Sequence, residues 1–164
     1  MRSRFIWGMW LAMGAILAQA AGCRDLNTEE TASPAEAKPN EGAAASPVFV
    51  SVTSDPVENP QAVDMALKFA GFALDEKRPT VLFFTVKGVQ LPTAAFPADF
   101  AFPDNPPLKA QLAGLIERGL EVHVCPVCMK AFKIVEGDLV PGAQVTTRPK
   151  LFSHIGPATC VFTF

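Results

Sequence analysis

Short apolar segments alternate with helical segments along the second part of the chain, from residue 47 onward. The segment VFVSV is a strand candidate, and TVLFFTV is apolar almost throughout, which is typical of a strand covered on both faces of a parallel sheet. Alternating apolar and polar residues in LEVHVC predict a third strand. The five predicted strands occupy residues 48–52, 80–86, 120–125, 143–145 and 159–164.

Two longer segments between these strands carry apolar residues at spacings of three and four, which places them on one face of a helix. In the first, Asn59 is a suitable N-cap with Pro60 behind it, and in the second Gly119 is placed to end the helix. A brief third helix is predicted over residues 149–155. The two apolar faces consist of Val63, Ala66, Leu67, Ala70, Ala73 and Leu74, and of Leu108, Leu112, Leu115 and Ile116. The pattern predicts an α/β fold, a three-layer α/β/α sandwich around a mainly parallel five-stranded sheet.

Residues 90–107 interrupt this pattern with an irregular loop. The segment holds five of the fifteen prolines and three phenylalanines, Phe96, Phe100 and Phe102. A loop of this length is usually functional or mobile, although one packed onto the surface through its own phenylalanines is equally expected.

The N-terminal part of the chain predicts export. Residues 1–22 combine two arginines with the apolar run FIWGMWLAMGAIL and small residues, the layout of a lipoprotein signal peptide, and the following Cys23 is the expected lipidation site. A plain signal peptide or an uncleaved anchor is the alternative. Arg24 stands where lipoproteins of the inner membrane usually have aspartate, which favours the outer membrane. The expected location is therefore the periplasmic face of the cell envelope, with residues 23–46, rich in Ala, Glu, Pro and Ser, as a flexible tether.

Charge and cysteine content exclude several classes of function. The 164-residue chain has a net charge of -2, and from residue 47 onward ten Lys and Arg face eleven Asp and Glu, so no basic surface for nucleic acid is expected. Besides Cys23 there are three cysteines, an odd number that argues against a disulfide framework. Cys160 lies in the apolar run TCVFTF, where we expect it to be a buried, inert residue.

The CPVC segment is the main candidate site. Cys125 closes a predicted strand, and Pro126 suits the first position of a helix, which makes Cys125 the N-cap. Backbone N–H groups at that position, together with Lys130 and Lys133, would lower the pKa of the thiol and raise its reactivity. Cys128, one helical turn away, could resolve a persulfide or sulfenate on Cys125.

Three interpretations of this segment remain open. Cys125 and Cys128 are catalytic cysteines in sulfur or redox chemistry, or they hold a soft metal such as copper or zinc together with His123, or they form a structural disulfide. His123 lies on the same predicted strand face as Cys125, but a packed core histidine is the more common outcome, and His154 is distant in sequence. Thr53-Ser54 and Lys87-Gly88-Val89 end two other strands and are expected at the same edge of the sheet.

The domain resembles the DsrE/DsrF-like family, which includes the TusD sulfur-relay proteins and YchN-like proteins. The resemblance rests on LEVHVCPVCMKAFKI followed by DLVPGAQV and TCVFTF, on FFTVKGV, and on VFVSVTS with its following helix, and it spans roughly Val48 to Phe164. It implies a domain that assembles into trimers or hexamers and needs no cofactor. It further implies that Cys125 accepts sulfane sulfur as a persulfide from a donor protein or small sulfur compound and passes it to a partner. Cys128 matches a second cysteine found in the YchN-like branch.

Overall fold

A five-stranded sheet forms the centre of the part of the chain that this computed structural model describes, residues 45–164. The predicted signal segment, Cys23 and all but the last two residues of the predicted tether lie outside the described residues. The strand order is β4-β3-β2-β1-β5, and every neighbouring pair is parallel. The strands are β1 (Val48–Val52), β2 (Thr80–Phe84), β3 (Glu121–Val124), β4 (Ala143–Val145) and β5 (Cys160–Thr163). The predicted parallel five-stranded sheet is confirmed.

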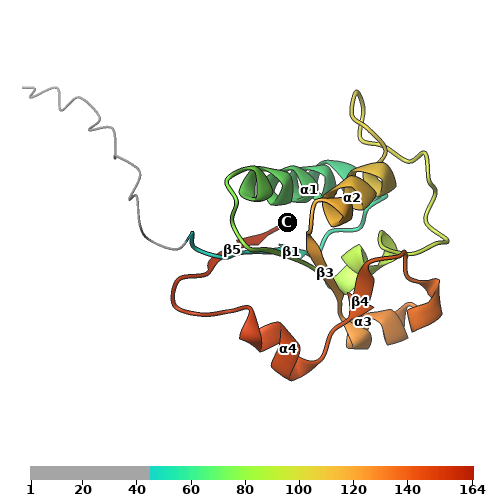
Figure 1. The fold of residues 1–164 in the computed structure, drawn as a ribbon. Coiled ribbons are helices and arrows are strands. Elements are labelled where there is room, and N and C mark those ends of the chain that lie inside the picture. Colours follow the sequence, from blue (N-terminus) through green and yellow to red (C-terminus); the bar gives the residue numbers. More distant parts are fainter. Residues whose placement is uncertain (1–44) are drawn as a thin grey trace, which may run out of the picture. The chain divides into compact units, whose positions relative to one another are not determined.

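Helices lie on both sides of the sheet, as the α/β/α prediction requires (Figure 1). On one side lie α1 (Pro60–Asp75) and α2 (Leu108–Glu117), and on the other lie the short α3 (Pro126–Ala131) and α4 (Arg148–Ser153). Two 3-10 turns, η1 (Val86–Gln90) and η2 (Glu136–Asp138), follow β2 and α3. Within residues 45–164, no helix is long and apolar enough to cross a membrane.

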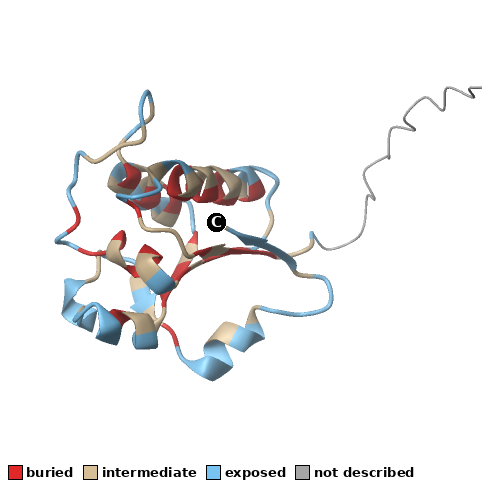
Figure 2. Ribbon diagram, turned by 180° about the vertical axis from the view of Figure 1, so that it is seen from behind, coloured by how far each residue is buried: buried red, intermediate tan, exposed pale blue. Residues whose placement is uncertain are grey.

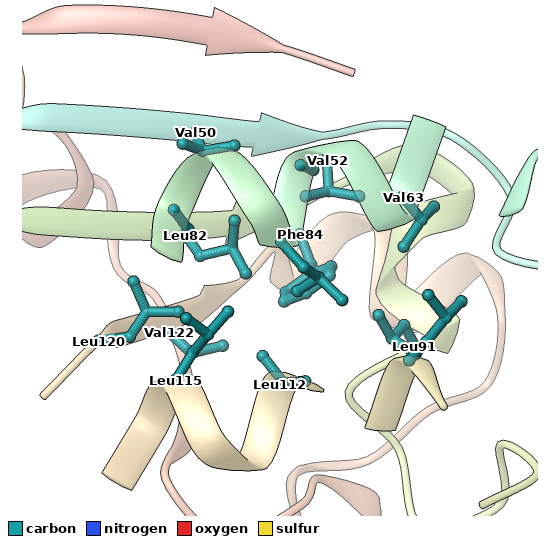
Figure 3. Close-up of a cluster of buried hydrophobic side chains, with 14 of the residues drawn as sticks. Val50, Val52, Val63, Leu82, Phe84, Leu91, Leu112, Leu115, Leu120 and Val122 are labelled. Atoms are coloured by element: carbon teal, nitrogen blue, oxygen red, sulfur yellow. The ribbon is translucent and has the colours of Figure 1, made fainter. Parts of the chain in front are cut away.

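Alternation along the central strands divides their side chains between the two faces of the sheet. Val50, Leu82, Phe84 and Val122 are fully buried and form a core with the apolar faces of α1 and α2 (Figure 3). The opposite face carries Phe49, Phe83 and His123, and its outer cover by α3 and α4 is mostly exposed to solvent (Figure 2).

The predicted helix ends are confirmed. The Asn59 side chain accepts a hydrogen bond of 3.2 Å from the backbone N–H of Ala62 and so caps α1, with Pro60 as the first helical residue. Gly119, just beyond α2, has a φ of 94°, a left-handed conformation that glycine adopts without strain.

The loop at residues 90–107 is packed onto the domain. Phe96 is buried and meets Phe100 edge to face, with ring centroids 5.5 Å apart. The Lys109 Nζ donates to the carbonyl oxygens of Ala94 and Phe96 at 3.1 and 3.0 Å. These contacts favour the packed surface excursion over the mobile loop.

Two sequence-based assignments need correction. The predicted strand 80–86 ends at Phe84, because Thr85 is the N-cap of η1 and Val86 is its first residue. Cys160 is exposed rather than buried, because β5 is an edge strand and all four of its residues reach solvent. Helix α1 covers β5 only in part: Phe69 packs against Phe162 and Phe164, with ring centroids 5.5 and 5.3 Å apart, and Cys160 remains exposed.

Candidate functional site

Cys125 lies where β3 passes into α3. Its backbone N–H donates to the carbonyl oxygen of Phe84 at 2.9 Å, which ties the end of β3 to β2. Its backbone is extended, with φ of −70° and ψ of 116°, and Pro126 begins the helix directly after it. The Cys125 carbonyl oxygen accepts from the N–H of Met129 at 2.9 Å. The predicted N-cap position of Cys125 is therefore confirmed.

The half-buried thiol of Cys125 has a shifted pKa. Burial raises the pKa, but the backbone N–H groups of Cys128 and Val127, the Cys128 side chain and the Thr85 hydroxyl lower it, and the net shift is downward. The Cys125 thiolate is thus stabilised by hydrogen-bond donors that contact its sulfur directly. The N–H of Met129 is not among these donors, because it donates to the Cys125 carbonyl oxygen.

Cys128 is held from the other side by the turn that follows β2. Its Sγ accepts a hydrogen bond from the backbone N–H of Val86 at 3.1 Å and lies 3.4 Å from the Thr85 hydroxyl oxygen. Val86 has a φ of 51°, a conformation that a β-branched residue rarely adopts. Backbone strain of this kind gathers at functional sites, because the surrounding structure must hold it in place.

The turn at Val86 is locked onto β1 by a close approach of backbones. The Thr85 N–H donates to the Val52 carbonyl oxygen at 2.9 Å, and the Gly88 N–H donates to the Thr85 carbonyl oxygen at 3.0 Å. A Cβ on Gly88 would lie 2.4 Å from the same Val52 oxygen. Only glycine fits there, so Gly88 allows the turn to reach Cys128.

Other residues expected at this edge of the sheet make hydrogen bonds and ion pairs that hold neighbouring segments together. The backbone N–H and hydroxyl of Thr53 both donate to the Phe164 carbonyl oxygen at 2.7 Å, which fastens the C-terminus. The Lys87 Nζ pairs with Glu58 at 2.5 Å and with Asp55 at 3.4 Å. The lysines that follow Cys128 along the chain, Lys130 and Lys133, are exposed.

His123 is placed with Glu121 and His154 rather than with the cysteines. It is fully buried, its Nε2 lies 3.1 Å from Glu121 Oε1, and its ring centroid is 5.0 Å from that of His154. Burial lowers the pKa of His123 and outweighs the Glu121 carboxylate, which raises it. The prediction of a packed core histidine is confirmed. A metal site built from His123 and the CPVC pair is not assembled among the described residues, where the three-ligand group is Glu121, His123 and His154.

Comparison with known proteins identifies the fold around this site. The sequence model of the DsrE/DsrF-like family matches residues 47–164. The chain belongs to the DsrE/DsrF-like family. Membership associates this DsrE-like domain with sulfur-relay or thiol-redox chemistry. A search of curated protein sequences finds no match.

Two solved structures share the fold. YchN from E. coli is similar with a TM-score of 0.60 and 16% identity, over 72% of this chain and 98% of YchN. MTH1491, a protein of unknown function from Methanobacterium thermoautotrophicum, is similar with a TM-score of 0.50 and 13% identity, over 70% of this chain and 96% of MTH1491. At these identities the likeness concerns the DsrE-like fold alone.

In this DsrE-like domain the arrangement at the carboxyl ends of β2 and β3 combines a favoured thiolate with a second thiol. Both Cys125 and Cys128 are free thiols. Thr85 and Val86, which contact this pair, were missed because the apolar run of β2 assigned them to a strand. The one signal in the sequence was Gly88, which lies just beyond the predicted strand 80–86. A glycine at such a position often marks a site where another backbone segment approaches closely.

Proposed function

We propose that Cys125 carries sulfane sulfur as a persulfide and that Cys128 is its resolving thiol. The observation that carries this proposal is the position of the two sulfurs between α3 and the strained Thr85–Val86 turn. The turn supplies a backbone N–H and a hydroxyl to Cys128, and the first turn of α3 supplies two N–H groups to Cys125. A lone buried cysteine would need none of these donors.

The loading step transfers one sulfur atom without net oxidation. The Cys125 thiolate attacks the outer sulfur of a donor persulfide, the sulfur–sulfur bond of the donor breaks, and the donor leaves as a thiolate. The first product is a Cys125 persulfide that still carries the proton of the donor persulfide, and loss of this proton to water gives the persulfide anion. Its single negative charge equals that of the thiolate and lies one sulfur further from the N–H groups of Val127 and Cys128 that favour the thiolate.

Unloading has two routes that differ in the sulfur attacked. An acceptor thiolate that attacks the outer sulfur becomes a persulfide and regenerates the Cys125 thiolate. Attack by Cys128 on the inner sulfur instead forms a Cys125–Cys128 disulfide and releases hydrosulfide, and an external dithiol must then reduce the disulfide. The second route is what makes Cys128 a resolving thiol.

The rim of the site is apolar and fits a protein partner. Val86 and Val127, which flank Cys128 along the two segments that hold it, are 52% and 76% exposed. Phe132, at the end of α3, is 40% exposed. Exposed apolar side chains gathered around a reactive group are typical of a docking surface, so we propose a sulfur donor or acceptor protein as the partner.

We further propose that the domain is attached to the periplasmic face of the cell envelope through a lipid on Cys23, with the outer membrane favoured. This proposal rests on the pattern of residues 1–22 and on Arg24. A homo-oligomer, a trimer or hexamer, follows from the family resemblance. The exposed Val161 and Phe162 on the edge strand β5 are compatible with a subunit contact.

Sulfur loading tests the proposal. The reduced protein is exposed to a low-molecular-weight persulfide, and its intact mass is compared with those of Cys125→Ser, Cys128→Ser and the matched control Cys160→Ser. We expect a gain of one sulfur atom in the wild type and in Cys160→Ser, and none in Cys125→Ser. Cys128→Ser should hold the added sulfur longer, because the resolving route is closed.

Two results would contradict the proposal. Loading that survives Cys125→Ser would assign the sulfur to another thiol. A wild type that gains no sulfur and only loses two hydrogens would show a disulfide-forming pair, and the DsrE-like fold would then serve dithiol redox chemistry.

A further inference from the structure

A cluster of two histidines and a partly exposed glutamate lies at the beginning of β3, away from the cysteines. Glu121 and His123 are two residues apart on one strand and point to the same face of the sheet. His154 ends α4 and reaches them from a separate segment, with its side chain 15% exposed. The fold therefore brings two imidazoles that lie 31 positions apart in sequence together with one carboxylate.

Two imidazole nitrogens of this cluster lack partners. The His123 Nδ1 and the His154 Nε2 are both inaccessible to solvent and have no hydrogen-bond partner. An unpaired buried polar nitrogen costs free energy, and in native proteins such a group usually reflects an absent ligand or a functional role. This applies most strongly to His154, whose free nitrogen is the one nearest Glu121.

We propose that Glu121, His123 and His154 bind a divalent transition-metal ion, with zinc as the best-matched ion. Each residue offers one ligand atom, and the three atoms lie within 4.8 Å of one another. Two imidazoles and one glutamate are a ligand set found in zinc sites that keep a fourth position for water. The proposal is independent of the chemistry assigned to Cys125.

The distances fit a shared ion. Zinc lies about 2.0–2.2 Å from nitrogen and oxygen ligands, so two ligands of a tetrahedral site are about 3.3 Å apart. The Glu121 Oε1 lies 3.1 Å from His123 Nε2 and 3.6 Å from His154 Nε2. Both separations are close to the tetrahedral value, and the third, between the two imidazole nitrogens, is within 4.8 Å. The two imidazoles must therefore move toward each other for the site to close around an ion.

Lys150 competes through its ammonium group with a metal ion for the Glu121 carboxylate. Its Nζ lies 2.8 Å from the same Glu121 Oε1, and it is four residues before His154 on α4. The Lys150 side chain is 48% exposed, so it can turn into solvent when an ion takes its place. The ion would replace the exposed ion pair between Lys150 and Glu121 with three coordinate bonds. An exposed ion pair contributes little to stability, so its loss costs little.

The proposed metal site opens to solvent through a pocket of its own, and a bound ion would connect α4 to the sheet. A pocket of about 480 Å³ lined by Glu121 and His154 opens beside it, with room for the water that completes the coordination. Along β3, Glu121 and Cys125 are four residues apart, roughly 13 Å at about 3.3 Å per residue. A bound ion would therefore pin α4 to the sheet without contacting the thiols.

Calorimetric titration of EDTA-treated, reduced protein with Zn²⁺ tests the proposal. We expect one ion per chain in the wild type and binding at least about 100-fold weaker in Glu121→Gln and His154→Ala, since loss of even an outer partner costs about 10- to 100-fold. Glu121→Gln keeps the size of the side chain and therefore the fold. Glu117→Gln is the matched control, because it makes the same chemical change at an exposed glutamate at the end of α2, outside the cluster.

Two further measurements separate this site from the cysteines. Lys150→Met should tighten Zn²⁺ binding by about two- to fivefold, because it removes an exposed competing cation. Co²⁺ should give visible absorption bands without the intense near-ultraviolet band of a cobalt–thiolate bond, and the Cys125→Ser/Cys128→Ser double variant should bind with wild-type affinity.

Three results would overturn the proposal. Wild-type protein that binds no Zn²⁺ would leave the cluster as an ion-pair network only. Binding that Glu121→Gln and His154→Ala do not weaken, or that disappears in the double cysteine variant, would place the ion elsewhere.

Discussion

Gly88→Ala tests how the strained turn at Val86 is held against β1. The added Cβ would lie 2.4 Å from the Val52 carbonyl oxygen and 3.0 Å from the carbonyl carbon, closer than packed atoms allow. Both are backbone atoms of a central strand, so the turn rather than the strand must shift. The shift breaks the hydrogen bond from the Thr85 N–H to the Val52 oxygen and moves Val86 away from Cys128.

The magnitude follows from two contributions. Overpacking of a tight contact costs about 1–3 kcal/mol, and a lost backbone hydrogen bond costs about 0.5–1.5 kcal/mol. Together they lower the free energy of unfolding by about 1.5–4.5 kcal/mol, which lowers the midpoint of thermal unfolding by roughly 5–20 °C for a domain of this size. Circular dichroism on heating measures the midpoint.

Gly114→Ala is the matched control for the same chemical change. Gly114 lies inside α2, and a Cβ there would meet no atom within 4 Å. Alanine is favoured over glycine in a helix by about 1 kcal/mol, so this variant should unfold at a higher temperature than wild type. If Gly88→Ala is as stable as wild type, or if the two variants change in the same direction, the close approach of η1 and β1 is refuted.

Three further predictions concern reactivity and stability. In metal-free protein, the alkylation rate of Cys125 should reach half its maximum at a lower pH than that of free cysteine, because the lowered pKa of Cys125 leaves more thiolate at neutral pH. Thr85→Val should raise the pH of this half-maximum. A pH profile identical to that of free cysteine would contradict the contacts described. Asn59→Ala should lower the free energy of unfolding, measured by chemical denaturation, by about 1 kcal/mol, because it removes the hydrogen bond that the Asn59 side chain accepts from the Ala62 N–H. An unchanged denaturation midpoint would mean that this cap does not contribute to stability. Exposed Cys160 should react readily with a thiol reagent in the folded monomer, and protection of Cys160 there would refute its placement on an open edge.

Local patterns account for what the sequence predicted correctly. The apolar face of α1, its Asn59 cap and the end of α2 at Gly119 depend on residues within one or two helical turns. The same is true of Cys125 as an N-cap, since a strand pattern followed by proline determines where the helix begins. Such features need no knowledge of the rest of the fold.

Features that depend on distant segments could not be predicted in this way. Val86 continues an apolar β-branched run, and only its contact with Cys128 and the approach of Gly88 to β1 explain its left-handed backbone. His154 meets Glu121 because β4 and α4 return the chain to β3, which no local spacing encodes. Glu121, by contrast, could have been found, since strand alternation places it on the face of His123.

The position of a transferred sulfur atom tests the central claim most directly. The reduced protein is loaded with a persulfide whose outer sulfur carries a heavy isotope, the thiols and persulfides are trapped by alkylation, and fragment spectra of the peptide with both CPVC cysteines locate the label. The account predicts the heavy sulfur on Cys125, with Cys128 and Cys160 alkylated as plain thiols. Label found on Cys128 or Cys160, or absent from all three, would contradict it.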